Sequence, residues 1–476
     1  MKSEEFRRCG YLVVDRITDY MERLERDAVR PVQSGVRPGE ILGSLPSQPP
    51  AEPESIDAIL DDFDRIIMPG ITHWQSPSFF GYFPSNISGP SILGELLAAG
   101  LGVQGMLWTT SPACTEVEMR MMDWLVRTCG LPEHFSTEHG PGGGVIQGSA
   151  SEAALCAIVA ARQRALADGA DPRNLCGYIS TQTHSSIEKS WKIAGLAPEN
   201  LHKTEPRPDD FSFDPVALAA AITADRVAGR IPFFVTGTIG TTSTAALDPL
   251  CAIGKTCRAE KIWFHVDGAY GGSAMVCPEL RGIADGLELA DSYCFNPHKW
   301  LLVNFDCDCF FVADRRPLVE AMTILPEYLR NAASDSGTVV DYRDWQVPLG
   351  RRFRALKLWM TIRYYGITGL QAFIRRKIEL GARLAETIAA TSEFEIVASP
   401  RLALTCFAHR DGDDKTREIV ERCNASGEML LSNTVLKTAN GRSRFVIRMH
   451  TASAHTEWEH VEAAWRKITD CAKNLR

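Results

Sequence analysis

The spacing of hydrophobic residues divides the chain into three parts. Near the N-terminus, apolar positions recur at helical spacing over residues 6–24 and again over 56–67. The segment between them, PVQSGVRPGEILGSLPSQPPAEPE, is rich in Pro, Gly and Ser, which is typical of an extended connection. The aromatic stretch MPGITHWQSPSFFGYFPSN follows and is interrupted by proline. It is either a loop that covers core or the wall of an aromatic pocket.

From about residue 144 the pattern changes. Short β-rich runs (CGYIS, IPFFVTGT, KIWFHVD, DSYCF) alternate with longer helical runs, among them PELRGIADGLELA. This alternation predicts an α/β domain with a mostly parallel sheet wrapped by helices. Ligands bind beyond the carboxyl ends of such strands. The residues that follow the runs should therefore share one edge of the sheet: His184, Thr242, Asp267 and Lys299.

The last third is predicted to be helical from about 345 to 390 and then to form strands and a closing helix. This pattern indicates a small α+β domain. We expect an N-terminal helical dimerisation segment over 1–84, a large domain over 85–357 and a small C-terminal domain over 358–476.

Composition and charge narrow the function classes. The 476 residues are 45% hydrophobic and 23% charged, with a net charge of −8. That balance argues against a nucleic-acid or anionic-membrane partner. No secretory signal or membrane span is evident, and fourteen cysteines then indicate free thiols in the reducing cytoplasm. Cys307 and Cys309 are too close for a usual zinc knuckle and lack a matching pair, so we expect no metal.

The segment CFNPHKWLLVNFDCDCFF contains a lysine that could take part in catalysis. Lys299 stands where a strand ends and the chain becomes apolar again. Burial lowers the pKa of a lysine, which can then act as a nucleophile or form a Schiff base. The alternative is a surface lysine whose aliphatic stem lies on apolar neighbours.

An anion site is predicted in GVIQGSASEAAL, where a strand passes through a turn into a helix. Ser149, Ala150 and Ser151 occupy the turn and the first helical positions, where N–H groups and hydroxyls can bind an anion. Simple N-capping by serine is the alternative. The spacings of a P-loop and of a dinucleotide fingerprint are absent.

An acidic residue is predicted at the same edge of the sheet. Asp267 ends WFHVDGAYGG and could bind a metal, a base or a ring N–H. A lysine, an acid and a phosphate cradle on one edge are what pyridoxal phosphate needs. His184 could stack on its ring or be an ordinary structural histidine.

Several segments together resemble the group II pyridoxal-phosphate decarboxylases and, within them, the aromatic-L-amino-acid decarboxylases. They include HWQSPSFFGYFPSN, GVIQGSASEAAL, THSSIEK, WFHVDGAYGGSAMVCPE, NPHKWLLVNFDC, PEYLR and DYRDWQVPLGRRFRALKLW, in family order over nearly the whole chain. The resemblance implies the fold type I, aspartate-aminotransferase-like architecture. It also implies a homodimer with active sites at the interface.

The resemblance assigns roles residue by residue. Lys299 becomes the cofactor lysine, Asp267 the partner of the pyridine nitrogen and His184 the residue stacked on the ring. Tyr328, in PEYLR, becomes the proton donor on a mobile loop. The other cofactor positions are Ser149, Ala150, Ser151, Thr242, Asn296 and His298. The substrate positions are Trp74, Tyr82, Phe83, Ser85 and Gly350, with Gln104 and Met106 supplied by the partner subunit.

The implied reaction converts an aromatic L-amino acid to its arylalkylamine and CO₂. Tryptophan, dopa, tyrosine, phenylalanine and 5-hydroxytryptophan all remain open, and Gly350 hints at an indolic substrate. An acidic substrate would need cationic groups in the pocket, and no Lys or Arg occurs between Trp74 and Ser88. The alternatives are an aromatic acetaldehyde synthase, a decarboxylase of a non-aromatic amino acid, an aminotransferase or desulfurase of the same fold, and a scaffold without cofactor.

Overall fold

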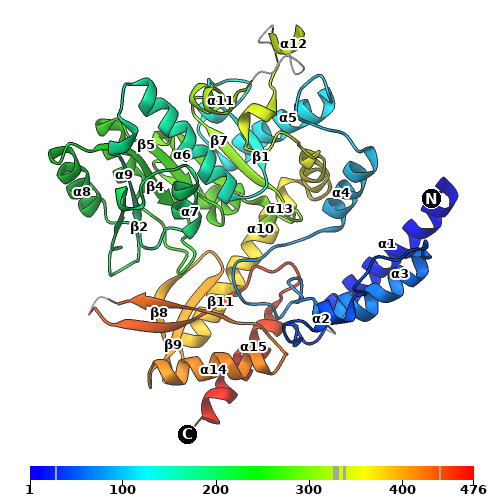
Figure 1. The fold of residues 1–476 in the computed structure, drawn as a ribbon. Helices are drawn as coiled ribbons and strands as arrows, with labels where there is room; N and C mark the ends of the chain where they lie inside the picture. Colours follow the sequence, from blue (N-terminus) through cyan, green and yellow to red (C-terminus); the bar gives the residue numbers. More distant parts are fainter. Residues whose placement is uncertain (27–28, 325–331, 336–338, 439–440, 476) are drawn as a thin grey trace.

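The computed structural model describes residues 1–476 except 27–28, 325–331, 336–338, 439–440 and 476 (Figure 1). A large α/β body carries a smaller domain below it, and a helical N-terminal segment extends to one side (Figure 1). The division into 1–84, 85–357 and 358–476 stays a prediction. Helix α13 (Arg354–Ala389) runs across the predicted boundary at 357.

A seven-stranded sheet forms the centre of the large body, in the order β1-β7-β6-β5-β4-β2-β3. Strands β6, β5, β4, β2 and β3 pair in parallel, and only β7 runs antiparallel to its neighbours β1 and β6. The predicted mostly parallel sheet is confirmed. The strands are β1 Gly143–Gln147, β2 Leu175–Ser180, β3 Leu201–Thr204, β4 Ile231–Thr238, β5 Trp263–Asp267, β6 Ser292–Phe295 and β7 Asp308–Val312.

Helices cover both faces of this sheet, which explains why its central strands are buried along their whole length. One face packs on α6 (Ala150–Ala167), α7 (Ser185–Ile193) and α11 (Arg316–Met322). The other face packs mainly on α5 (Pro112–Cys129), α8 (Pro215–Val227), α9 (Leu250–Glu260) and the first part of α13. The two faces thus have separate cores, and the loops at the carboxyl edge between them are free to build a site.

One predicted helix is wrong. PELRGIADGLELA forms two short 3₁₀ turns, Pro278–Ala284 and Leu287–Leu289, instead of an α-helix. Gly286 between them has φ = 103°, and a Cβ there would lie 2.2 Å from the backbone nitrogen of Cys251. The close approach of α9 therefore requires a glycine turn that interrupts the helical pattern.

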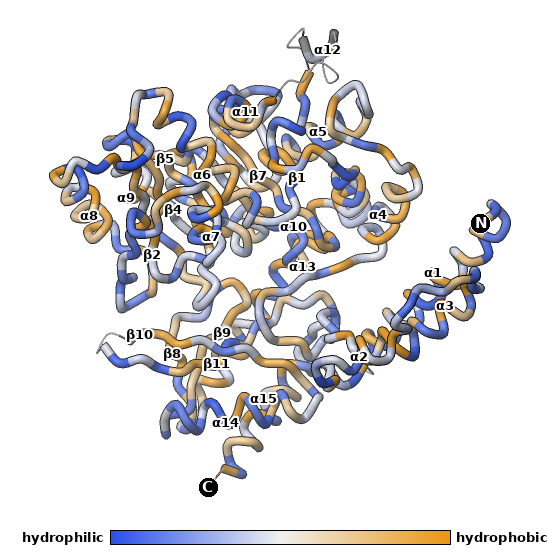
Figure 2. The backbone as a smooth tube through the Cα atoms, viewed as in Figure 1, coloured by the Kyte–Doolittle hydropathy of each residue, from blue (hydrophilic) through white to orange (hydrophobic). Residues whose placement is uncertain are grey.

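The N-terminal helices are confirmed. Helix α1 (Ser3–Glu25) and α3 (Ile56–Asp62) lie side by side, away from the large body (Figure 1). Arg8 pairs with Asp57 at 3.2 Å, which joins the two helices. Helix α1 exposes apolar side chains, among them Phe6 (62% exposed) and Tyr11 (65% exposed). Hydrophobic positions along this projecting segment are visible in Figure 2.

The smaller domain contains the predicted strands and closing helix. Its antiparallel sheet has the order β10-β11-β9-β8. Its elements are β8 Phe394–Arg401, β9 Leu404–His409, α14 Asp413–Ala425, β10 Ser432–Lys437, β11 Ser443–His450 and α15 Trp458–Lys473. The remaining α-helices among the described residues are α2 Glu40–Ser44, α4 Gly89–Leu101, α10 Pro297–Trp300 and α12 Ala332–Asp335.

Two expectations about the whole chain can be compared with the structure. All fourteen cysteines are free, as predicted. Within the described ranges, none of the helices combines the length and apolar character that a membrane crossing requires.

Candidate active site

A cavity of about 240 Å³ lies at the carboxyl edge of the large sheet. The four residues predicted to share this edge, His184, Thr242, Asp267 and Lys299, all line it. Six further predicted residues do so as well, namely Phe83, Ser149, Ala150, Ser151, Asn296 and His298. Residues more than 200 positions apart in the sequence therefore line one cavity.

Lys299 lies on α10, directly after β6. Its backbone nitrogen donates to the Asn296 carbonyl at 3.0 Å, so the chain turns sharply and aims the side chain into the cavity. The ammonium nitrogen lies 5.5 Å from the centre of the Phe83 ring. Burial lowers the pKa of Lys299, and the nearby Asp267 carboxylate partly opposes that shift. The structure thus favours the reactive lysine over the surface lysine.

Asp267 ends strand β5 and is 5% exposed. Its Oδ1 accepts a hydrogen bond from the Ala269 backbone nitrogen at 2.9 Å. Among the described residues, no hydrogen bond engages Oδ2. The carboxylate is therefore fixed in orientation and keeps one oxygen for a donor inside the cavity.

The N-terminus of α6 also opens on the cavity. Ser149 is the N-cap residue, yet its side chain makes no capping hydrogen bond to the described chain. Simple N-capping is therefore not what its hydroxyl does here. Ser149, Ala150 and Ser151, with the first N–H groups of the helix, line the cavity where the anion cradle is predicted.

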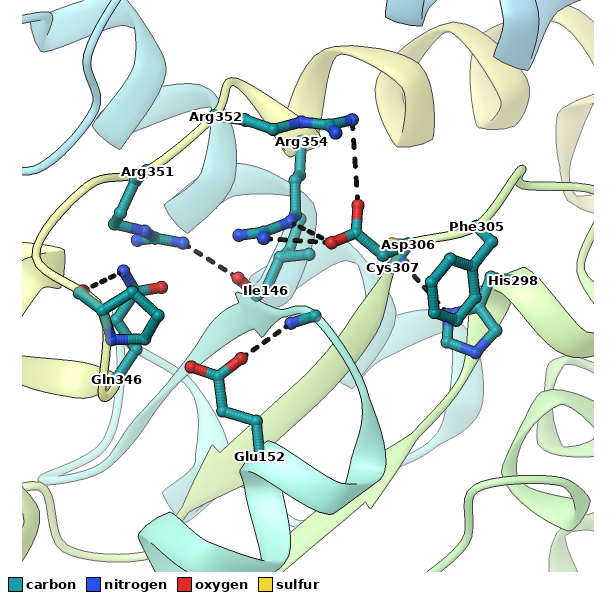
Figure 3. Close-up of polar contacts among 12 residues, drawn as sticks. Ile146, Glu152, His298, Phe305, Asp306, Cys307, Gln346, Arg351, Arg352 and Arg354 are labelled. Carbon is teal, nitrogen blue, oxygen red and sulfur yellow. Dashed lines mark hydrogen bonds and ion pairs between the residues drawn. The ribbon is translucent and has the colours of Figure 1, made fainter. Parts of the chain in front are cut away.

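Two histidines are held in the neutral form. His184 caps α7: its Nδ1 accepts from the Ser186 backbone nitrogen at 3.2 Å, and burial lowers its pKa. The Nδ1 of His298 accepts from the Cys307 backbone nitrogen at 2.9 Å, and burial lowers its pKa to about 3. The Phe305 ring lies 4.7 Å from the His298 ring (Figure 3). Both rings are thus fixed and uncharged at neutral pH.

Charged side chains next to the N-terminus of α6 form a set of polar contacts (Figure 3). Glu152 of α6 accepts from the Gly148 backbone nitrogen at 3.0 Å and fixes the turn that precedes the helix. Asp306 pairs with Arg354 at 3.0 Å next to the same turn. Arg351 donates to the Ile146 carbonyl of β1 at 2.9 Å.

One wall of the cavity is aromatic. Phe83 stacks on Tyr270 with ring centres 3.8 Å apart and planes at 9°. Tyr270 stacks in turn on Trp300, and its hydroxyl contacts His450 Nε2 at 2.8 Å. The sequence did not single out Tyr270, although it lies three residues after Asp267. The other unanticipated lining residues are Thr238, Gly240 and Ala269.

Several predicted substrate residues do not line this cavity. Trp74 and Tyr82 stack on each other at 5.6 Å and remain 38% and 57% exposed. Ser85 contributes a carbonyl that accepts from the Gln75 side chain. Tyr328 lies outside the described residues.

Gln104, Met106 and Gly350 form a separate group. Gln104 accepts from the Arg351 backbone nitrogen at 2.5 Å, and a Cβ on Gly350 would lie 3.3 Å from the Gln104 amide. The Met106 carbonyl accepts from Arg343 at 3.1 Å. None of the three lines the cavity of its own chain.

The cavity can be compared with the needs of pyridoxal phosphate. It offers an amine, a carboxylate with a free oxygen and a helix N-terminus whose serine is not used for capping. Two buried atoms at its edge, Thr238 Oγ1 and Asn296 Oδ1, have no partner among the described residues. Buried polar atoms are normally paired, so a polar ligand is expected at this place. The residues fit the cofactor.

A second cluster of polar side chains was not anticipated. Cys176, His202 and Asp225 lie close enough to hold a metal ion. However, Asp225 already accepts from the Tyr178 hydroxyl at 2.7 Å, and Arg230 contacts both His202 and Asp225. The cluster is satisfied as a hydrogen-bonded network.

Comparison with known proteins agrees with this geometry. Residues 38–410 match the pyridoxal-dependent decarboxylase conserved domain. The chain is 45% identical to phenylacetaldehyde synthase from Arabidopsis thaliana, covering 100% of this chain and 97% of that protein. It is 43% identical to aromatic-L-amino-acid decarboxylase from Rattus norvegicus, with 100% and 99% covered.

A solved structure extends the likeness to the fold. TDC from Oryza sativa, crystallised with PLP and tryptamine, superposes with a TM-score of 0.96 at 38% identity, covering 100% of this chain and 99% of that one. The fold is therefore that of the pyridoxal-phosphate decarboxylases. On the evidence of the site, the matched domain and these relatives, the chain belongs to the pyridoxal-dependent decarboxylase family.

Proposed function

We propose that this chain uses pyridoxal phosphate to convert an aromatic L-amino acid to its arylalkylamine and CO₂. The observation that carries the proposal is one cavity in which Lys299 and Asp267 face a stacked aromatic wall of Phe83 and Tyr270. Similarity to an aromatic-L-amino-acid decarboxylase over the whole chain supports it.

The residues divide the work of holding the cofactor. When bound, pyridoxal phosphate supplies an electron-withdrawing ring that stabilises negative charge at the substrate Cα as CO₂ leaves. Lys299, whose pKa is lowered by burial, would hold it covalently. Asp267 Oδ2 would hold the proton of the ring nitrogen, and His184, fixed by Ser186, would lie against the ring.

The charge of the cavity favours an aromatic substrate. An acidic substrate needs a free cation beside its side chain, and residues 74–88 carry none. Arg448 lies 5.4 Å from the Phe83 ring centre, but it donates to the carbonyls of Thr242 and Ser243. A stacked ring pair instead offers flat apolar surface, which suits an aromatic side chain.

We also propose a homodimer with composite sites in the cytoplasm. Gln104, Met106 and Gly350 would complete the substrate site of the partner, since they lie apart from the cavity of their own chain. The exposed apolar side chains of α1 provide surface for dimerisation. The fourteen free cysteines suit a reducing compartment.

An aldehyde-forming reaction is the second candidate, because the Arabidopsis relative is a phenylacetaldehyde synthase. Simple decarboxylation gives amine and CO₂. The oxidative reaction consumes O₂ and water and gives aldehyde, CO₂, ammonia and hydrogen peroxide. Which reaction occurs depends on whether a proton reaches the substrate Cα before O₂ reacts. By the family resemblance, Tyr328 is the donor of that proton.

Substitution of Tyr328 tests this choice. A positioned phenol contributes on the order of a hundredfold or more to a proton transfer. We predict that the wild type releases amine without peroxide and that Tyr328→Phe still releases CO₂ but forms mainly aldehyde. Amine, aldehyde, peroxide and O₂ are measured for one aromatic substrate. Peroxide from the wild type in proportion to CO₂ would favour the second candidate, and unchanged amine formation by the variant would remove Tyr328 as donor.

A further inference from the structure

Asp308 is a second acid at the same sheet edge, and the cofactor positions do not include it. It begins strand β7 and pairs in register with Gln147 of β1. On the other side of β7, Cys309 pairs with Phe295 of β6 in an antiparallel register. Continuing that register by one residue brings Asp308 opposite Asn296, which lines the cavity.

Strand alternation fixes the face on which Asp308 lies. Asp267 pairs with Cys294, and Cys294 pairs with Phe310, so these three side chains share a face. Asp308 is two residues from Phe310, and Asn296 is two residues from Cys294. Both therefore point to the face of Asp267, which α6 covers with its anion cradle at one end.

Several buried acceptor atoms at and around Asp308 have no hydrogen-bond donor among the described residues. Its side chain is fully buried, and neither carboxyl oxygen has a hydrogen-bond partner within the described residues. The same holds for Gln147 Oε1 and Asn296 Oδ1. No cation within 4 Å pairs with Asp308 in the described part of the chain. An ionised carboxylate is very costly in such a place.

A proton on the Asp308 carboxyl group removes its charge and supplies a hydrogen-bond donor. We propose that Asp308 is a neutral acid that donates a hydrogen bond to Asn296 Oδ1 and so turns the Asn296 amide N–H groups toward the phosphate cradle. Asp308 is then a positioning residue, because it acts through Asn296 and does not line the cavity. The part of this inference that concerns phosphate rests on the proposed function.

Burial and the neighbouring carboxylates both favour the protonated form of Asp308. Burial raises the pKa of Asp308 well above its usual value, and the carboxylates of Asp267 and Glu152 raise it further, whereas Lys299 opposes them. The titratable groups whose charges interact with Asp308 come from β5, α6, β6, α10, its own strand and the residue before that strand. They are Asp267, Glu152, Cys156, Cys294, Lys299, Cys307 and Cys309.

The first test uses the apoprotein and needs no turnover. With a raised pKa in the folded state, unfolding releases the Asp308 proton at any pH between the unfolded pKa and the folded pKa. The stability from this group is therefore lost as pH rises through that window. Asp308→Asn cannot release a proton. The ratio of the wild-type unfolding constant to that of the variant should rise about tenfold per pH unit from pH 5 toward the folded pKa, as measured by urea unfolding.

Asp306→Asn is the matched control. Asp306 pairs with Arg354, and interaction with cations keeps the pKa of Asp306 below its usual value. Both states of the protein are then ionised at this position between pH 5 and 8, so the variant should lose a constant amount of stability over that range. A constant ratio for Asp308→Asn as well would overturn the neutral acid.

The second test concerns cofactor binding. Affinity of the apoprotein for pyridoxal phosphate is measured by quenching of tryptophan fluorescence. Asp308→Asn keeps a donor and should change the Kd by less than about threefold, whereas Asp308→Ala should raise it about tenfold. Wild-type affinity in Asp308→Ala would overturn the link to Asn296. Either failure leaves decarboxylation itself untouched, since neither readout depends on catalysis.

Discussion

The position of Lys299 favours its neutral amine. It follows a buried strand, turns at Pro297 and faces a cavity, so the ammonium form loses hydration that water would supply. Only the neutral amine reacts with a carbonyl, and its fraction increases with pH. A lowered pKa therefore moves this reaction toward neutral pH.

We predict that borohydride trapping of pyridoxal phosphate on the apoprotein attaches the pyridoxyl group to Lys299. Its rate should rise with pH and reach half its maximum below 10.5, the ordinary lysine pKa. Peptide mapping identifies the site, and Lys299→Ala is the control that should carry no adduct there. A midpoint at 10.5, or an adduct on another lysine, would contradict the assignment.

At the level of elements, the N-terminus of α6 differs from an ordinary capped helix. The Ser149 hydroxyl makes no cap hydrogen bond, whereas Asp214, the N-cap of α8, accepts from the Val216 backbone nitrogen at 2.8 Å. The two residues occupy the same position in their helices. They can therefore separate the roles of anion binding and capping.

Ser149→Ala should leave the stability of the apoprotein unchanged within about 0.5 kcal/mol. It should weaken binding of pyridoxal phosphate about tenfold or more, since a hydrogen bond to a charged group is lost. Asp214→Ala should do the reverse: it should cost about 1 kcal/mol of stability and leave affinity unchanged. Urea unfolding and fluorescence titration measure both quantities. Equal behaviour of the two variants would refute the anion cradle.

Much of the cavity could be predicted because strand ends mark its edge. Lys299, Asp267 and His184 each follow a β-rich run, and alternation alone brings them together. Tyr270 was missed, since its place depends on contacts with Phe83 and His450, which lie far away in the sequence. The helix predicted over 278–290 failed because its apolar pattern gave no sign of the close approach at Gly286.

At the scale of the whole molecule, one chain does not bring all predicted substrate residues to its cavity. Gln104 and Gly350 lie next to each other, and both are exposed. Helix α1 extends from the body (Figure 1), and its apolar side chains Phe6 and Tyr11 are exposed. A second copy of the chain explains both features. Each site would then require two subunits.

Subunit mixing tests this arrangement. Lys299→Ala removes the cofactor lysine, and Gly350→Arg should block the site of the partner. Each variant should be nearly inactive alone. After unfolding and refolding together in equal amounts, half of the dimers are hybrids with one intact site, so activity should recover to about a quarter of wild type. A mixture no more active than its parents would contradict shared sites.

Decarboxylation of an aromatic amino acid is tested most directly with a substrate panel on the holoenzyme, with CO₂ and amine measured together. The panel contains tryptophan, tyrosine, phenylalanine, dopa and 5-hydroxytryptophan, beside glutamate and cysteine sulfinate. We predict that at least one aromatic amino acid gives amine and CO₂ in equal amounts, with the highest kcat/KM of the panel. A higher kcat/KM for glutamate or cysteine sulfinate than for every aromatic substrate would contradict it.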